Sequence, residues 1–164
     1  MKSFLHSSFT EFFTFLRANK ISRCREREVV SWFVTSALIN KIKKGTWLND
    51  PSQIVVEAAV PQLPVYGKKQ CCKDLVIWNK SFQTYWNEKF EAVYHPAYII
   101  EWKVVRYWQR VKPSMNHDFE WLSAFSKVYN TVCISVNIEF KKGNEFVVEV
   151  ITFLNGKQKN KILY

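Results

Sequence analysis

An acid and a base lie two positions apart in one strand-like stretch of the sequence. Residues 98–105 (YIIEWKVV) are apolar except for Glu101 and Lys103. Successive side chains of a β-strand alternate between its faces, so Glu101 and Lys103 are expected to project side by side. Burying a carboxylate and an ammonium costs several kcal/mol unless they are paired, bound to a metal or used in chemistry. The two residues are therefore candidates for a functional site.

Two further acids interrupt predicted strands. Asp74 is the only acid in the apolar stretch 71–78, and Glu57 interrupts a second stretch over 53–63. An isolated acid in such a stretch is more often an edge or solvent-facing residue than a functional one, and this is the favoured interpretation of Glu57. Asp74 becomes a candidate only in combination with other residues.

A predicted N-terminal helix supplies another acid. Ser22 is a candidate N-cap for a helix that runs to about Lys44, with Gly45 at its C-terminal end. Glu26 lies one turn before the centre of the apolar stripe of this helix, whereas Glu28 points well away from it. Of these two acids, Glu26 is expected to face the core.

The remaining patterns predict a single α/β domain over residues 1–164. Periodicity and turn residues indicate a helix over 8–18, a short helix or irregular insertion over 81–93, a helix from Asn116 or Asp118 to about Tyr129, strands over 131–140 and 145–154, and a frayed basic tail over 156–161. Helix capping is favoured over catalysis for Asp118. The expected order is helix, helix, three strands, helix and two strands.

This order resembles the PD-(D/E)xK nucleases, the restriction-endonuclease-like superfamily. Its core is a central mixed β-sheet flanked by helices, and the resemblance implies the same architecture here. The signature of this core is an acid on the second strand of a hairpin and an acid-x-lysine on the next strand. Residues 73–77 (KDLVI) match the first motif, with lysine where the motif name has proline, and residues 101–103 (EWK) match the second. Residues 26–30 (EREVV) are similar to the first core helix of Holliday-junction resolvases in this superfamily. The resemblance covers residues 22–154, which leaves 1–20 as a helical extension.

The resemblance implies metal-dependent hydrolysis of DNA phosphodiester bonds. Asp74, Glu101 and Glu26 would hold Mg²⁺, with Mn²⁺ able to substitute, because hard cations prefer oxygen ligands. Such a cation neutralises phosphate charge and lowers the pKa of a bound water. Lys103 would orient or deprotonate that water, or stabilise developing negative charge. Whether Glu57 or Glu28 joins the site is left open.

The charge of the chain favours a polyanionic partner. Its formal net charge is +10 at pH 7, which raises affinity for nucleic acid or for an acidic membrane surface. Nucleic acid is the favoured partner, and the sequence does not separate DNA from RNA. The candidate phosphate contacts are Lys68, Lys69, Arg106, Arg110 and Lys112. For the last three, a solvated charged face is an equal alternative.

The composition argues against several other classes of protein. A hydrophobic content of 48% argues against disorder, and no apolar run approaches the roughly 20 residues of a membrane helix. The four cysteines lack the spacing of a zinc site and are expected to be reduced. The first residues do not resemble a secretory signal, so a cytoplasmic protein without a membrane partner is expected.

Two other functions fit the same residues. One is a catalytically silent module with this fold that binds nucleic acid or takes part in assembly. The other is the nuclease subunit of a transposition or restriction complex, inert without its partner. A homodimer would suit cleavage of both strands of a duplex, although no residue of the sequence requires one.

Overall fold

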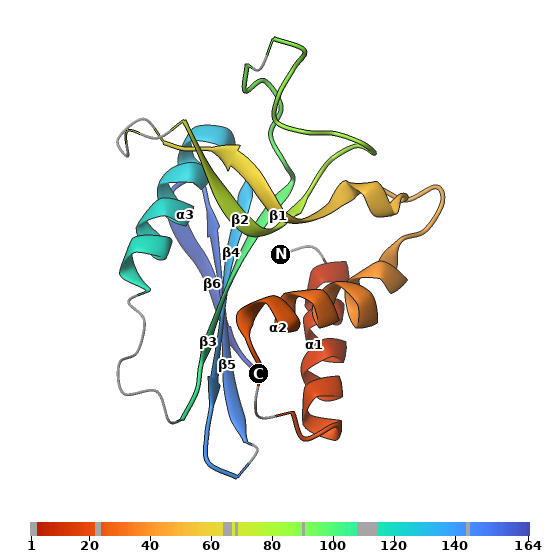
Figure 1. Cartoon of the computed structure of the whole chain (residues 1–164), viewed down its shortest axis with the longest axis vertical. Coiled ribbons are helices and arrows are strands. Elements are labelled where there is room, and N and C mark those ends of the chain that lie inside the picture. Colours follow the sequence, from red (N-terminus) through yellow and green to blue (C-terminus); the bar gives the residue numbers. More distant parts are fainter. Residues whose placement is uncertain are drawn as a thin grey trace.

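A mixed β-sheet of six strands lies between two layers of helices (Figure 1). The computed structural model describes residues 3–21, 24–63, 67, 69–89, 91–107, 115–143 and 145–164. The strands follow one another across the sheet in sequence order: β1 (Ile54–Pro61), β2 (Gln70–Ile77), β3 (Tyr98–Val105), β4 (Val132–Phe140), β5 (Phe146–Leu154) and β6 (Lys157–Leu163). The predicted α/β class, with a mixed sheet flanked by helices, is confirmed.

Helix α3 (Asn116–Tyr129) covers one face of the sheet. It connects β3 to β4, which pair in parallel, whereas the other four strand pairings are antiparallel. A parallel pair needs a crossover connection, and the helix provides it. Its buried side chains Trp121, Leu122 and Phe125 belong to one apolar cluster with Ile99 of β3.

Helices α1 (Ser3–Ala18) and α2 (Glu26–Phe33) cover the opposite face (Figure 1). Three fully buried rings surround the indole of Trp102 on β3. The ring centroids of Phe9 and Phe12 lie 6.0 Å from that of Trp102, and the centroid of Phe33 lies 5.2 Å from it. Burial of rings of this size contributes roughly 1.5–3 kcal/mol each, so this layer is a main source of stability.

The side chains of β3 alternate between these two layers. Ile100, Trp102 and Val104 belong to the apolar cluster of α1 and α2. Between them, Glu101 and Lys103 face the α3 side, where Lys103 forms an ion pair with a residue of that helix. The shared face predicted for Glu101 and Lys103 is therefore confirmed.

The predicted helices differ from the observed ones at their ends. Helix α1 begins at Ser3, before the predicted start. Helix α2 has Arg25 at its N-cap position, so the prediction that Ser22, which lies outside the described residues, caps this helix is wrong. After Phe33 the second helix continues as a π-helical turn, Val34–Leu38, and then as a 3₁₀ turn, Ile39–Lys41. The hydroxyl groups of Thr35 and Ser36 donate to carbonyls of the preceding turn. Such bonds often bend helices, and here they lie in the segment where the regular α-helix ends.

The tail predicted to fray forms a sixth strand instead, so the predicted element order lacked β6. Asn155 and Gly156 both have positive φ, 53° and 72°, as in the tight turns that join antiparallel strands. The backbone N–H of Tyr164 donates to the carbonyl of Val148, and its ring packs on Phe13. Lysines are common on edge strands because they discourage pairing with other chains, and here they resembled a solvated tail.

The insertion over 81–93 is irregular. Its described part contains one isolated β-bridge, between Trp86 and Ala92, and no helix. A 3₁₀ turn, Pro51–Gln53, leads into β1. No helix within the described ranges is both long and apolar enough to cross a membrane.

Candidate active site

The candidate site lies where β2 and β3 stop pairing. Their ladder joins Leu75–Ile77 to Tyr98–Ile100 and ends there. Beyond that point β2 continues to pair with β1, and β3 continues to pair with β4. In Figure 1 the β1–β2 hairpin turns across the end of the sheet while β3 runs on beside β4. Asp74 and Glu101 are the first residues beyond the ladder, so the end of pairing gives their side chains room.

Asp74 bridges the two diverging strands. One of its carboxylate oxygens accepts a hydrogen bond from the backbone N–H of Trp102 at 2.8 Å. This N–H has no ladder partner on β2, because the pairing ends at Ile100. Opposite Asp74 on β1, Glu57 has a φ of 53°, which bulky residues rarely adopt. The backbone irregularity and the bridging carboxylate therefore occur at the same level of the sheet.

A small hollow between α2 and β1 reaches Asp74. It has a volume of about 30 Å³ and is lined by Arg27, Val30, Val56, Glu57 and Asp74. This volume holds one or two particles of the size of a water molecule. Glu57 is exposed, as expected, and it forms an ion pair of 2.7 Å with Arg27. Glu57 thus lies at the edge of the site but is held by α2.

Glu101 is buried in an ion pair that the sequence did not predict. Its carboxylate lies 2.5 Å from the ammonium of Lys73, and the two side chains are 9% and 8% exposed. The same ammonium lies 3.7 Å from the ring centroid of Trp121 on α3. A cation in this position gains both from the carboxylate and from the π-face of the indole. Lys73 stands where the nuclease motif has proline.

Burial and the neighbouring carboxylate of Asp74 both raise the pKa of Glu101. The pKa of Glu101 is raised above 4.5, first by burial and then by the charge of Asp74 and a hydrogen bond between the two carboxyl groups. The positive charge of Lys73 opposes this rise. Two carboxyl groups in contact at the end of a ladder form an arrangement typical of functional sites.

Lys103 is held by an acid of α3. Its ammonium lies 3.3 Å from a carboxylate oxygen of Asp118. Burial acts to lower the pKa of Lys103, but the carboxylates of Glu26, Asp118 and Glu101 outweigh it and raise the pKa. Asp118 is therefore not the helix cap predicted for it, since Met115 occupies that position. The crossover helix brings Asp118 to β3, which local capping rules do not reveal.

Glu26 reaches the same strand from the other layer. It is the first residue of α2 and accepts a hydrogen bond from the backbone N–H of Val104. Burial and the charge of Asp74 raise the pKa of Glu26, while Lys103 and this hydrogen bond lower it. Glu28 is exposed and accepts a hydrogen bond from the backbone N–H of Arg25 at 2.5 Å. Glu26 is therefore the acid of this helix that faces the site, as predicted.

The four predicted residues interact electrostatically around the end of the β2–β3 ladder, but each also has a partner in the protein. Asp74 and Glu101 offer adjacent carboxylate oxygens, the donor chemistry that Mg²⁺ prefers. Within the described ranges, however, no three His, Cys, Asp or Glu residues are grouped closely enough to hold a metal. The chemistry of Asp74 and Glu101 fits a divalent cation, with Glu26 nearby but not grouped with them.

Two of the five predicted phosphate contacts can be placed. Lys69 is exposed and lies immediately before β2. Arg106 follows β3, and its Nε donates to the carbonyl of Cys24 at 3.2 Å. Lys68, Arg110 and Lys112 lie outside the described residues.

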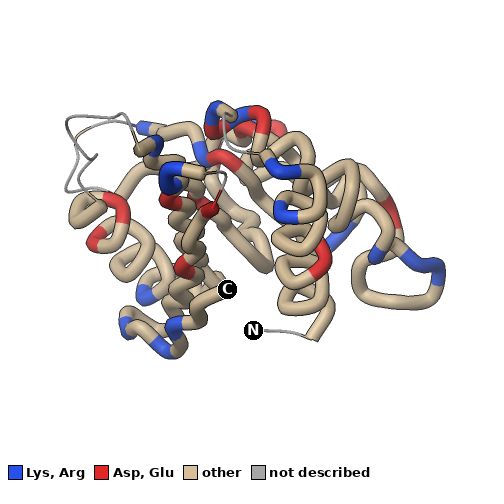
Figure 2. The backbone as a smooth tube through the Cα atoms, turned by 90° about the horizontal axis from the view of Figure 1, so that it is seen from below, with Lys and Arg blue, Asp and Glu red and all other residues tan. Residues whose placement is uncertain are grey.

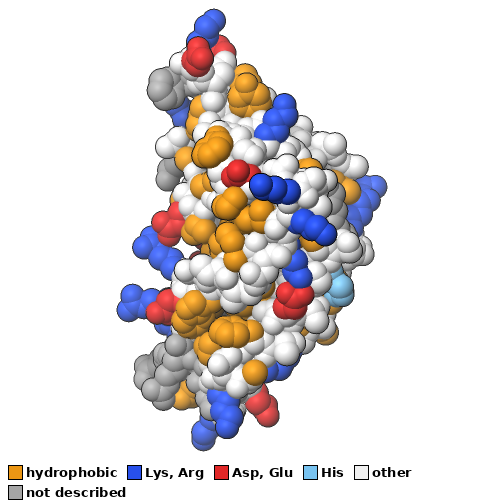
Figure 3. Space-filling view, turned by 90° about the vertical axis from the view of Figure 1, so that its right-hand side faces the viewer, with side chains coloured by type: hydrophobic (Ala, Val, Ile, Leu, Met, Phe, Trp, Pro, Cys, Tyr) orange, Lys and Arg blue, Asp and Glu red, His pale blue; other side chains and the backbone are white. Residues whose placement is uncertain are grey.

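The described basic residues do not form a single patch on the side of the molecule formed by α1 and α2. Figure 2 shows basic positions on peripheral turns as well as near the acids of the sheet. In Figure 3 lysines and arginines are dispersed over the side formed by α1 and α2, among apolar patches. Among its described residues, that side therefore carries no concentrated basic surface for a nucleic acid.

Comparison of the chain with protein-family models, curated proteins and solved structures gives no significant match.

Proposed function

We propose that this chain is a metal-dependent endonuclease with a restriction-endonuclease-like core, which hydrolyses phosphodiester bonds of DNA. The observation that carries the proposal is that Glu26, Asp74, Glu101 and Lys103 interact electrostatically around the point where β2 and β3 stop pairing. The element order of α2, three strands, a crossover helix and a parallel strand also agrees with the core of that superfamily.

Each of the four residues has a role in this proposal. Asp74 and Glu101 would hold the divalent cation, with Glu26 as the third acid nearby. When bound, the cation neutralises phosphate charge and lowers the pKa of a bound water. The raised pKa of Lys103 keeps its ammonium charged at neutral pH. Lys103 therefore suits the stabilisation of negative charge on the phosphate better than the removal of a proton from water.

Nicking of supercoiled plasmid tests the proposal. The parent protein is expected to nick DNA with Mg²⁺ or Mn²⁺ and not with EDTA. Asp74→Asn and Lys103→Gln should each lower the rate by about 10²-fold or more. Glu145→Gln and Lys142→Gln, at exposed positions outside the site, serve as matched controls and should cut like the parent. The proposal is wrong if Asp74→Asn and Lys103→Gln cut as fast as their controls.

One observation favours a second function, a catalytically silent module that binds nucleic acid. Glu101 is already neutralised by the buried ammonium of Lys73, and no three acids of the described chain are grouped around a common metal position. Such a module would bind DNA with an affinity that falls steeply with salt and does not change with EDTA. Binding without nicking in any metal would support this function. Nicking that appears only with an added partner protein would instead indicate a nuclease subunit of a larger complex.

A further inference from the structure

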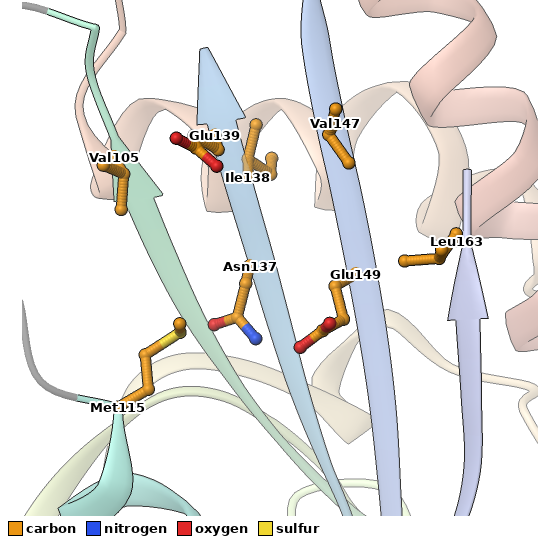
Figure 4. A pocket seen from close by; sticks show the side chains of 8 residues that line it. All are labelled: Val105, Met115, Asn137, Ile138, Glu139, Val147, Glu149 and Leu163. Carbon is orange, nitrogen blue, oxygen red and sulfur yellow. The ribbon is translucent and has the colours of Figure 1, made fainter. Parts of the chain in front are cut away.

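A cavity of about 170 Å³ opens on the α3 side of the sheet, beside the start of α3. Its apolar lining residues are Val105 from β3, Met115 from the position before α3, Ile138 from β4, Val147 from β5 and Leu163 from β6 (Figure 4). Pockets that hold drug-sized molecules measure roughly 300 Å³ or more. This cavity therefore suits one small ring system rather than a whole nucleotide.

Three polar side chains line the cavity: Asn137, Glu139 and Glu149. Glu139 forms an ion pair of 2.8 Å with Lys141, so the hydrogen-bonding edge of the cavity is formed by Asn137 and Glu149. Asn137 is 8% exposed, and its Oδ1 accepts from the hydroxyl of Ser135 at 3.3 Å. The Nδ2 of Asn137 is buried and has no hydrogen-bond partner within the described residues. A buried N–H without an acceptor is costly, so an acceptor supplied by a ligand would be favourable.

Glu149 provides a hydrogen-bond acceptor opposite this donor. Glu149 and Asn137 are paired residues of β5 and β4, and their head groups point toward one another (Figure 4). One oxygen of Glu149 lies 2.5 Å from the ammonium of Lys161. A carboxylate has two oxygens with several lone pairs, so it can accept a further hydrogen bond. Asn137 and Glu149 thus present one donor and one acceptor side by side in the cavity.

This cavity adjoins the candidate active site. Lys103 and Asn137 are paired residues of β3 and β4, and neighbouring strands lie about 4.8 Å apart. Both side chains face the α3 side of the sheet. In DNA a base is joined to its phosphate through a single sugar. A phosphate beside Lys103 would therefore place its own base, or a neighbouring one, within reach of the cavity.

We infer that this cavity binds one unpaired nucleobase that carries an exocyclic amino group, such as cytosine or adenine, next to the phosphate to be cleaved. This inference rests on the proposed function. The Nδ2 of Asn137 donates to a ring nitrogen of the base, and the adjacent amino group donates to Glu149. The apolar walls contact the ring faces, and the Met115 sulfur suits an aromatic ring. Unpaired bases are recognised in this way, by hydrogen bonds to one edge and by apolar contacts to the faces.

Fluorescence of 2-aminopurine tests the inference. The probe is a short duplex with one 2-aminopurine opposite an abasic site, and EDTA keeps the DNA uncut. Stacking on other rings quenches the fluorescence of 2-aminopurine. The described side chains that line the cavity include no aromatic ring. Transfer of the base from the duplex into the cavity of the parent protein should therefore raise the emission. Val147→Trp fills the cavity and should abolish the rise, while anisotropy of an end-labelled duplex shows that the DNA remains bound. Val128→Trp, at an exposed position on α3, is the matched control and should retain the rise.

A second measurement tests the polar edge. Duplexes with an unpaired cytosine should bind the parent about tenfold more tightly than duplexes with an unpaired thymine, and Glu149→Gln should reduce this preference. Equal binding of the two bases, an unchanged rise with Val147→Trp, or no binding of the duplex would each overturn the inference. Because both assays contain EDTA, they do not depend on cleavage. A parent that gives the expected signals but does not nick plasmid would refute only the proposed hydrolysis.

Discussion

On β3, Trp102 lies among the rings of α1 and α2, whereas Glu101 and Lys103 lie one position away on the α3 side, each held in an ion pair. Both faces are covered by helices, but the side chains around Trp102 are aromatic rings, whereas the partners of Glu101 and Lys103 are Lys73 of β2 and Asp118 of α3. The aromatic face fixes the position of the strand. The charged face can then keep ionisable groups partly desolvated, at a cost that the apolar packing offsets.

The same contrast continues on β4. Val136 and Ile138 pack in the cluster of α1 and α2, while Ser135 and Asn137 face the α3 side. Polar groups on this face lie level with Glu101 and Lys103, because the parallel register pairs Glu101 with Ser135 and Lys103 with Asn137. A group of four polar side chains, most of them buried, therefore forms between two strands whose sequences look largely apolar. This contrast can be tested by substitutions on either face.

The largest loss of stability is expected on the aromatic face. Trp102→Ala should lower the free energy of unfolding by about 3–5 kcal/mol, because it leaves a cavity among three buried rings. Urea unfolding followed by circular dichroism measures this change. Val128→Ala, at an exposed position of α3, should change the free energy by less than about 0.5 kcal/mol. Similar losses for the two variants would contradict the assignment of this face to stability.

Breaking the buried ion pair between Lys73 and Glu101 should lower the free energy of unfolding by nearly as much. Lys73→Met leaves the Glu101 carboxylate buried without its counter-ion, which typically costs about 3 kcal/mol. The double variant Lys73→Met/Glu101→Gln should recover a large part of this loss, because no charge is then left unpaired. Chemical unfolding of the two variants at pH 7 measures the difference. A double variant no more stable than Lys73→Met would show that the ion pair is not the cause.

The stability of the Lys73→Met variant should also change with pH in a defined direction. The folded-state pKa of Glu101 is already raised above 4.5, and loss of Lys73 removes a cause that lowers it. The folded state then retains a proton that the unfolded state loses. Stability should therefore be fully present below about pH 4.5 and should fall as pH rises through the folded-state pKa. Glu101→Gln in the same background should remove this fall, as measured by thermal unfolding across pH.

A smaller loss of stability is expected when the ion pair between Lys103 and Asp118 is broken. Asp118→Asn removes one of the charges that raise the pKa of Lys103, so that pKa should fall. If the ammonium assists cleavage, the high-pH limb of the nicking rate should move to lower pH. The stability loss should be only about 0.5–1 kcal/mol, because both side chains are partly exposed. An unchanged pH profile would show that Lys103 does not act through its charge.

The smallest loss of stability is expected at the exposed ion pair between Arg27 and Glu57, beside the site. Arg27→Ala removes an ion pair whose side chains are 85% and 46% exposed. Solvent screens such pairs, so the free energy of unfolding should change by less than about 1 kcal/mol. Thermal unfolding at low and high salt measures the change. A loss as large as that of Lys73→Met would contradict the distinction between exposed and buried pairs.

The sequence by itself determined the features that depend on local periodicity. Period-2 alternation placed Glu101 and Lys103 on one face, and helical periodicity distinguished Glu26 from Glu28, because both rules depend only on neighbouring residues. The order of the elements up to β5 was predicted from such patterns, whereas the mixed sheet was expected only from the resemblance to the PD-(D/E)xK nucleases. The sixth strand was not, because its lysines satisfy the requirements of an edge strand and of a solvated tail equally well.

Only the tertiary structure decided the partners of these charges. Lys73 meets Glu101 and Asp118 meets Lys103 across 28 and 15 positions of the sequence respectively, distances that no local pattern spans. The donor of Asn137 and the acceptor of Glu149 face one cavity because β4 and β5 are in register. Strand pairing and the crossover of α3 bring these groups together, and side-chain burial then sets their pKa values.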